Sequence, residues 1–120
     1  MVTPIPALLA LGFFEQEEYK EIFKLKELLE KAKIPFTFKK LDDYRNGYQI
    51  LYPVEGIENR CSVIEHIYSY GHDKDLLEIM GLLTDEEAEH DSVVGYLSAE
   101  NVFHRIYRDF KGRGNEYGID

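Results

Sequence analysis

The sequence predicts a single α+β domain with an N-terminal helix, a three-stranded antiparallel meander, and two or three C-terminal helices packed on the sheet. Apolar residues recur at helical spacing near both ends of the chain, whereas they alternate with polar residues in the middle. An Asn-Gly pair separates two of the alternating runs, as in a β-hairpin. The 120 residues, 44% of them hydrophobic, suffice for one core. We expect an N-terminal arm over residues 1–14, the domain over 15–111 and a flexible tail over 112–120.

The first predicted helix covers about Glu15–Lys33. Its apolar residues follow three- and four-residue spacing, with Glu and Lys on the other face. The helix ends before Pro35, because a proline disfavours helical conformation in the residue that precedes it. The apolar stripe consists of Tyr19, Ile22, Phe23, Leu25, Leu28, Leu29 and Ala32.

Three strands are predicted after this helix. Phe36–Tyr44 and Tyr48–Pro53 alternate in polarity, and Asn46-Gly47 between them is a strong hairpin signal because both turn positions favour positive φ. Arg60–Tyr70 is the third strand. We expect one of its faces to carry Cys61, Val63 and Ile67, and the other Ile64, His66 and Tyr68. Exposed edge strands, or the N-terminal arm, can pair two copies, so a homodimer is compatible with this sheet.

Two helices are predicted next. Asp73 is a suitable N-cap for a helix over about Lys74–Leu83, whose apolar residues suggest a buried face. Thr84 and Glu87 have the form of a capping box, so we expect a short acidic turn or helix after it. We expect His90–Tyr96 to be a connection without regular structure.

The last predicted helix covers Ala99–Phe110 and is capped by Ser98. Its apolar stripe has clean three- and four-residue spacing. Arg105 and Arg108 lie off this stripe. The helix is therefore expected to pack on the sheet beside the first helix.

Most of the net negative charge lies in one quarter of the chain. Residues 71–100 carry nine acidic residues against one basic residue, and the whole chain has a net charge of −9. Such a run is usually a solvated face. It can also bind a basic partner protein, or imitate a nucleic-acid backbone and occupy a basic groove. The predicted binding residues are Asp85, Glu86, Glu87, Glu89 and Asp91.

The composition excludes several classes of function. Phosphate binding requires clustered Lys and Arg, so the net charge argues against direct binding of nucleic acid or of anionic membranes. No segment has the ~20 apolar residues of a membrane span. The one cysteine, Cys61, cannot form an internal disulfide, which favours a reducing compartment, the cytoplasm. Phosphate-binding, dinucleotide, zincin and nucleophile-elbow motifs are also missing, so we expect no cofactor.

The chain opens with an apolar stretch, Val2–Phe14. It lacks a basic start and is followed directly by acidic residues, so we do not expect a signal peptide. Two interpretations stay open. The stretch is an arm that docks on the domain or on a neighbouring subunit, or the translation start has been assigned upstream of the true one.

Reactive residue types are densest around the end of the third predicted strand. The cluster consists of Glu65, His66, His72, Asp73 and Asp75. It could hold a metal or provide a His-Asp acid–base pair, with His66, His72 and Asp73 as candidate catalytic residues. The spacing of the two histidines matches no metal signature, and Asp73 is expected to cap a helix, so the sequence favours a structural role. Cys61 is expected to be a small buried residue, because it and His66 project to opposite faces of a strand.

Several stretches resemble small uncharacterised proteins encoded by phages and prophages of Gram-positive bacteria. They are Cys61-Ser-Val-Ile-Glu-His66, Ser69-Tyr-Gly71, Leu76-Leu-Glu-Ile-Met-Gly-Leu-Leu-Thr84, Asp91-Ser-Val-Val-Gly-Tyr-Leu97 and Ala99-Glu-Asn-Val-Phe103. The resemblance covers about residues 22–110 and contains no catalytic motif. It implies a bacterial intracellular setting and an accessory role in phage biology.

The sequence therefore favours a non-enzymatic accessory protein that binds another protein, with its acidic segment as the contact surface. Two alternatives stay open. The acidic segment could make the protein a nucleic-acid mimic that inhibits a DNA-handling enzyme. The protein could instead be a small metal-dependent hydrolase that uses His66, His72 and Asp73.

Overall fold

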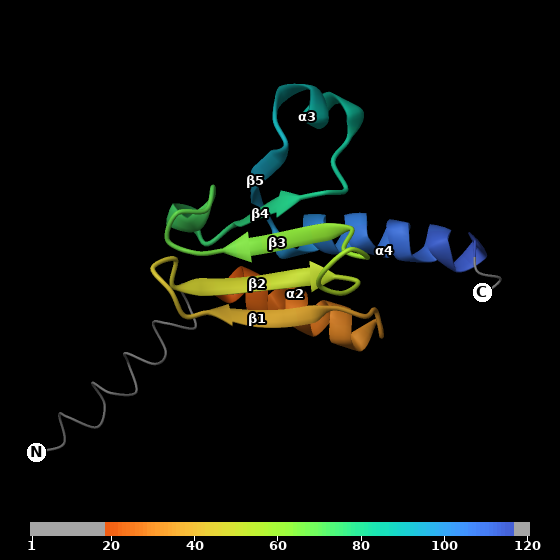
Figure 1. The fold of residues 1–120 in the computed structure, drawn as a ribbon, viewed down its shortest axis with the longest axis horizontal. Helices are drawn as coiled ribbons and strands as arrows, with labels where there is room; N and C mark the ends of the chain where they lie inside the picture. Colours follow the sequence, from red (N-terminus) through yellow and green to blue (C-terminus); the bar gives the residue numbers. More distant parts are fainter. Residues whose placement is uncertain (1–18, 117–120) are drawn as a thin grey trace, which may run out of the picture.

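The structure, a computed structural model, describes residues 19–116, with side chains up to residue 113, and contains an antiparallel sheet of five strands (Figure 1). Each strand pairs with its neighbour in the sequence, in the order β1-β2-β3-β4-β5. The α+β class is confirmed, whereas the predicted sheet lacked two strands. The elements are α2 (Lys20–Lys31), β1 (Thr37–Leu41), β2 (Gly47–Tyr52), β3 (Cys61–Glu65), η1 (His72–Lys74), β4 (Leu77–Met80), α3 (Asp85–His90), β5 (Val93–Leu97) and α4 (Ala99–Glu116).

The two long helices, α2 and α4, lie side by side on one face of the sheet, behind the strands in Figure 1. Their apolar stripes bury one core against that face. Leu25 of α2, Val63 of β3 and Ile106 of α4 all have no exposed surface. The predicted packing of the first and last helices on the sheet is confirmed, and the opposite face of the sheet carries no described helix.

Helix α2 confirms the apolar stripe of the first predicted helix. Ile22, Leu25 and Leu29 are fully buried, and the predicted start at Glu15 lies outside the described residues. The helix ends just before Lys33, which has a left-handed φ of 59°, and the Ile34 N–H closes the end by donating to the Leu29 carbonyl oxygen at 3.0 Å.

The Asn-Gly hairpin is confirmed, but for a different reason at its second residue. Asn46 takes the expected positive φ, 46°. Gly47 is already the first residue of β2, and a Cβ atom there would lie 2.2 Å from the Glu65 carbonyl oxygen of β3. Glycine is therefore needed because two strands approach closely, not because the turn bends there.

The third predicted strand is shorter than expected. Strand β3 ends at Glu65, and the segment that follows turns back at once, because the Ser69 N–H donates to the His66 carbonyl oxygen at 2.9 Å. The core face of β3 therefore carries Cys61, Val63 and Glu65, all fully buried. The predicted faces were wrong beyond residue 65, and Ile67 and Tyr68 lie exposed in the turn.

The predicted helix over Lys74–Leu83 is wrong, because this segment contains η1 and then strand β4. Leu77 and Ile79 are fully buried while Met80 is 56% exposed, so the alternation of a strand is present over four residues. The apolar spacing fits a helix equally well, and pairing with β3 decides between them. Asp73 does not cap a helix, since it lies inside η1.

The predicted connection over His90–Tyr96 is also wrong, because it contains strand β5. Val94 pairs with Ile79 of β4, and Leu97 pairs with Leu77, with a register shift between the two pairs. Gly95 is the reason that the sequence did not predict this strand, because glycine is depleted in strands. It is required because a Cβ atom there would lie 2.3 Å from Cβ of Tyr70, which packs over the strand.

The capped helices α3 and α4 confirm their sequence signals. Thr84 Oγ1 accepts from the Glu87 N–H, the Glu87 carboxylate accepts from the Thr84 N–H, and Ser98 Oγ accepts from the Asn101 N–H. Helix α4 continues to Glu116, beyond its predicted end at Phe110 and into the predicted tail. None of the helices between residues 19 and 116 has the length and apolar character that crossing a bilayer requires.

Candidate functional site

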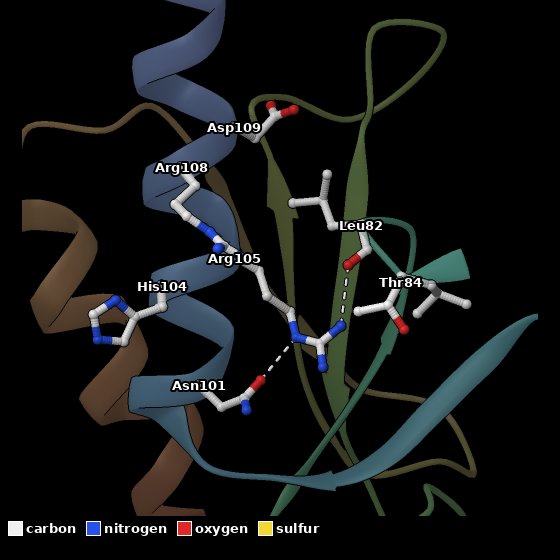
Figure 2. Close-up of a pocket in the computed structure, with 8 residues that line it drawn as sticks. Leu82, Thr84, Asn101, His104, Arg105, Arg108 and Asp109 are labelled. Carbon is white, nitrogen blue, oxygen red and sulfur yellow. Dashed lines mark hydrogen bonds between the residues drawn. The ribbon is translucent and has the colours of Figure 1, made fainter. Parts of the chain in front are cut away.

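A cleft of about 550 Å³ lies between α4 and the segment that joins β4 to α3 (Figure 2). Two leucines make its apolar side, and polar and cationic side chains of α4 make the other. The lining residues are Leu82, Leu83, Thr84, Asn101, His104, Arg105, Arg108 and Asp109. The sequence showed that the two arginines lie off the apolar stripe of α4, but it gave no sign of what they face.

Arg105 fastens α3 to α4. Its guanidinium donates two parallel hydrogen bonds to the Glu87 carboxylate, both 2.8 Å long. Two more, drawn in Figure 2, go to the Leu82 carbonyl oxygen at 3.1 Å and to Asn101 Oδ1 at 2.7 Å. The hydrogen bonds from Arg105, together with that from the Thr84 N–H, lower the pKa of Glu87 to about 2. The pair is therefore ionised at neutral pH and holds α3 in place.

Replacing Arg105 with alanine is expected to loosen α3 from the rest of the domain. The side chains of Arg105 and Glu87 are only 14% and 27% exposed, so breaking their pair should lower the free energy of unfolding by about 1–3 kcal/mol. Hydrogen exchange should show faster exchange of the α3 amides. Arg108→Ala is the control, with a change below about 0.5 kcal/mol. Equal protection of α3 in both variants would contradict this role.

Asp109, at the edge of the cleft, is also engaged in holding the fold together. It accepts from Tyr52 Oη at 2.8 Å and from Arg60 Nε and Nη2 at 2.8 Å and 2.6 Å. Burial opposes ionisation of Asp109, but the hydrogen bonds from Arg60 and Tyr52 outweigh it and lower the pKa. Asp109 is thus a structural anchor between α4 and β2, and its carboxylate is not available to a ligand.

His104 and Arg108 are the cleft residues whose polar groups stay open to a ligand. Both side chains are exposed, one turn apart on α4. Neither forms a hydrogen bond or ion pair with any residue that the structure describes, and the ring of His104 lies 6.4 Å from that of Phe103. The cleft therefore combines an apolar side with two exposed basic groups.

The predicted acidic binding residues lie on and beside α3, which stands away from the sheet at the top of Figure 1. None of the six residues of α3 is buried. Glu87 differs from the others because Arg105 and the capping box occupy its carboxylate. We define the acidic arm as Asp85, Glu86, Glu89 and Asp91, whose side chains are all exposed.

His66 and Asp73, two of the three candidate catalytic residues, lie in different surroundings, one buried and the other exposed. His66 is 8% exposed, and its Nδ1 accepts from the Tyr68 N–H at 3.1 Å. Burial lowers its pKa, so the neutral form is favoured. Asp73 lies at the surface and accepts from Tyr96 Oη at 3.0 Å. Within residues 19–116, no group of three or more His, Cys, Asp or Glu side chains is arranged to hold a metal ion.

Two other members of the predicted cluster, Glu65 and Asp75, meet at the N-terminus of α2. Glu65 Oε1 accepts from the Ile22 N–H and Asp75 Oδ1 from the Glu21 N–H, both at 3.4 Å. Glu65 has no exposed surface, and its Oε2 is buried. Burial, and then the neighbouring Asp75, raise the pKa of Glu65 far above its ordinary value. The neutral form of the Glu65 carboxyl is therefore favoured at neutral pH.

The ring of His72 belongs to a series of aromatic contacts that leads to the strand residue paired with Glu65. His72 Nδ1 is buried without a hydrogen-bond partner among the described residues, and its ring lies 5.9 Å from that of Tyr19. The Tyr19 ring in turn lies 5.2 Å from Tyr48, which pairs with Glu65 across the sheet. The alternation of Glu65 with Cys61 and Val63 was the sequence signal for its burial, but the sequence suggested Glu65 only as a member of the reactive cluster.

Cys61 is confirmed as a small buried residue. It has no exposed surface, and burial raises the pKa of its thiol to about 12. The thiol is therefore neutral and inaccessible at ordinary pH, which excludes it as a nucleophile in this conformation.

Comparisons of the chain with protein-family models, with curated proteins and with solved structures give no match. The features that bear on function are therefore those described above. They are a rigidly fastened acidic arm, a cleft with two exposed basic groups beside it, and a buried carboxyl pair at the start of α2.

Proposed function

We propose that this chain is a non-enzymatic protein-binding domain whose acidic arm contacts a basic surface of a partner protein. One observation carries the proposal. Helix α3 is too short and too exposed to contribute to the core, yet a capping box and the Arg105–Glu87 pair hold it in a fixed position. Such a helix presents carboxylates to solvent at little further cost in conformational entropy when a partner binds.

The charge distribution supports the same proposal. The four carboxylates of the acidic arm have no basic partner among residues 19–116, since Arg105 is committed to Glu87. An array of unpaired like charges attracts an oppositely charged surface and increases the rate of encounter. The cleft beside the arm offers His104 and Arg108 to an acidic or amide side chain of the same partner.

The test is capture of binding proteins from a bacterial lysate, with the variant Glu86→Lys/Glu89→Lys/Asp91→Lys. These positions avoid Glu87, so the fastening of α3 is kept. The matched control is Glu27→Lys/Glu55→Lys/Glu58→Lys, which makes the same change in net charge at three exposed positions elsewhere. We expect the arm variant to lose bound proteins at least about tenfold and the control to keep them. Equal loss from both, or from neither, would show that the arm is not the contact surface.

The nucleic-acid mimic is a narrower form of this proposal. It predicts that duplex DNA competes with the partner and that binding weakens steeply with salt. The hydrolase alternative has less support, because Asp73 faces solvent while His66 is buried and already accepts a backbone hydrogen bond. The phage relationship and the cytoplasmic setting stay predictions, since they follow only from the resemblance and the cysteine content.

A further inference from the structure

Exposed aromatic side chains gather on two neighbouring loops at one end of the sheet. The turn between β1 and β2 and the segment between β3 and η1 lie together at the left of Figure 1, and the Ile67 N–H donates to the Arg45 carbonyl oxygen at 3.0 Å. We define the tyrosine patch as Tyr44, Ile67, Tyr68, Tyr70 and Tyr96.

Contacts join members of the patch in two pairs, which are Tyr44 with Tyr68 on the loops and Tyr70 with Tyr96 of β5. The rings of Tyr44 and Tyr68 lie 6.0 Å apart. On the other side, the Tyr96 N–H donates to the Tyr70 carbonyl oxygen at 3.2 Å, and Tyr70 packs against Gly95. Tyr44 is 76% exposed and Tyr68 65%, so large parts of both rings face solvent. Exposed aromatic side chains that lie close together in this way are typical of binding sites.

The charges around the patch are mostly negative. Asp43 and Arg45 neutralise each other in a pair with a 2.6 Å contact, so Arg45 adds no net positive charge. Asp42 and Asp73 are exposed, and the Tyr96 hydroxyl donates to Asp73 Oδ1, while Lys74 is the nearby base. Tyrosine rings with carboxylates at their edges favour a cation over the ring face.

We infer that the tyrosine patch docks an arginine or lysine side chain of a protein partner, held against the tyrosine rings with its charge toward the neighbouring carboxylates. This inference rests on the proposed function and deepens it. The acidic arm supplies long-range attraction to a basic partner, whereas the patch supplies the buried aromatic contact on which affinity depends. The occupant is thus a basic segment of another protein.

Hydrogen bonds hold the backbone segment that carries Tyr68 and Tyr70 in place, as binding of a side chain by the patch requires. The segment that carries Tyr68 and Tyr70 is fixed at its start by His66, whose N–H and carbonyl group both bond to Ser69 Oγ at 3.0 Å and 2.8 Å. It is fixed at its end by Asp75, which accepts from the N-terminus of α2. Side chains presented from a fixed backbone lose less entropy on binding.

The experiment records amide shifts of the isotope-labelled full chain on titration with a short peptide in which arginine alternates with leucine. The control peptide carries the neutral isostere citrulline in place of arginine. We expect shifts around Tyr68, Tyr70 and Tyr96 with the arginine peptide, and roughly tenfold weaker binding of the citrulline peptide. The double variant Tyr44→Ala/Tyr68→Ala should weaken arginine-peptide binding by a similar factor, whereas Tyr107→Ala on α4 should leave it unchanged.

Three results would overturn the inference. They are equal binding of both peptides, no binding of either, and shifts confined to the acidic arm. The last result would leave the proposed function intact while removing the patch from it. The arm variant could lose the lysate proteins and still bind the arginine peptide fully at the patch. That result would support the inference, with the acidic arm and the tyrosine patch acting in separate steps of recognition.

Discussion

Glu65→Gln is expected to raise the free energy of unfolding at neutral pH and to flatten its dependence on pH. In the unfolded chain, Glu65 ionises with its ordinary pKa of 4.5, whereas burial and Asp75 raise its pKa in the folded protein. The folded state therefore binds the extra proton from about pH 4.5 upward, so stability falls as pH rises through this window. The slope is about 1.4 kcal/mol per pH unit, which amounts to about 3 kcal/mol by pH 7.

Glutamine should remove this dependence because it is neutral at every pH in the window. Its amide can donate to Asp75 and its carbonyl oxygen can accept from the Ile22 N–H, so the hydrogen bonds of the protonated acid are retained. Urea unfolding between about pH 5 and pH 9 measures the difference. Glu27→Gln, on the exposed face of α2, is the control and should follow the original protein. Parallel stability curves for Glu65→Gln and the control would show that Glu65 is ionised in the fold.

Gly47→Ala is expected to destabilise the fold strongly. The added Cβ would lie 2.2 Å from the Glu65 carbonyl oxygen and 2.6 Å from Cα of His66, and both are backbone atoms of the paired segment. Relief requires β2 and β3 to separate where Glu65 enters the core, so we expect a loss of at least about 3 kcal/mol. Thermal or urea unfolding measures it.

Gly112→Ala is the matched control, with the opposite expected sign. Gly112 lies in α4 with nothing within 4 Å of the added Cβ, so alanine should stabilise the helix by up to about 1 kcal/mol. If both variants kept the stability of the original protein, the close approach of β2 and β3 at Gly47 would have to be relieved by small shifts of the backbone.

The sequence predicted those elements whose signals are local. A capping residue, a helix-ending residue or a turn residue in the sequence marks each of these elements, which are helices α2, α3 and α4 and the first hairpin. Strand β4 has only four residues, and their apolar spacing suits a helix as well as a strand, so pairing with β3 decides. Strand β5 contains Gly95, whose role depends on a tyrosine more than twenty residues earlier in the chain.

The candidate sites were predictable to different degrees. Composition alone identifies the acidic arm, because it requires only a run of acidic residues at the surface. Composition cannot show that Glu87 forms a hydrogen-bonded ion pair with Arg105, because the two residues are 18 positions apart in the sequence. Tyr68 and Tyr70 of the tyrosine patch fell within the predicted third strand, but the early end of β3 moves both into a loop. The cleft depends on how α4 packs and has no local signal.

The order of the strands also bears on how the domain can fold while the chain is being synthesised. Every strand pairs with its neighbour in the sequence, so the sheet closes only short loops and can form as the chain emerges. Helix α4 is synthesised after all five strands, and its Ala99 N–H donates to Glu21 Oε1 in α2 at 2.7 Å once the helix docks. Until residues 99–116 have left the exit tunnel, the core cluster lacks the buried side chains of α4, among them Val102 and Ile106. An unfinished core of this kind exposes apolar surface, which is the feature that chaperones bind.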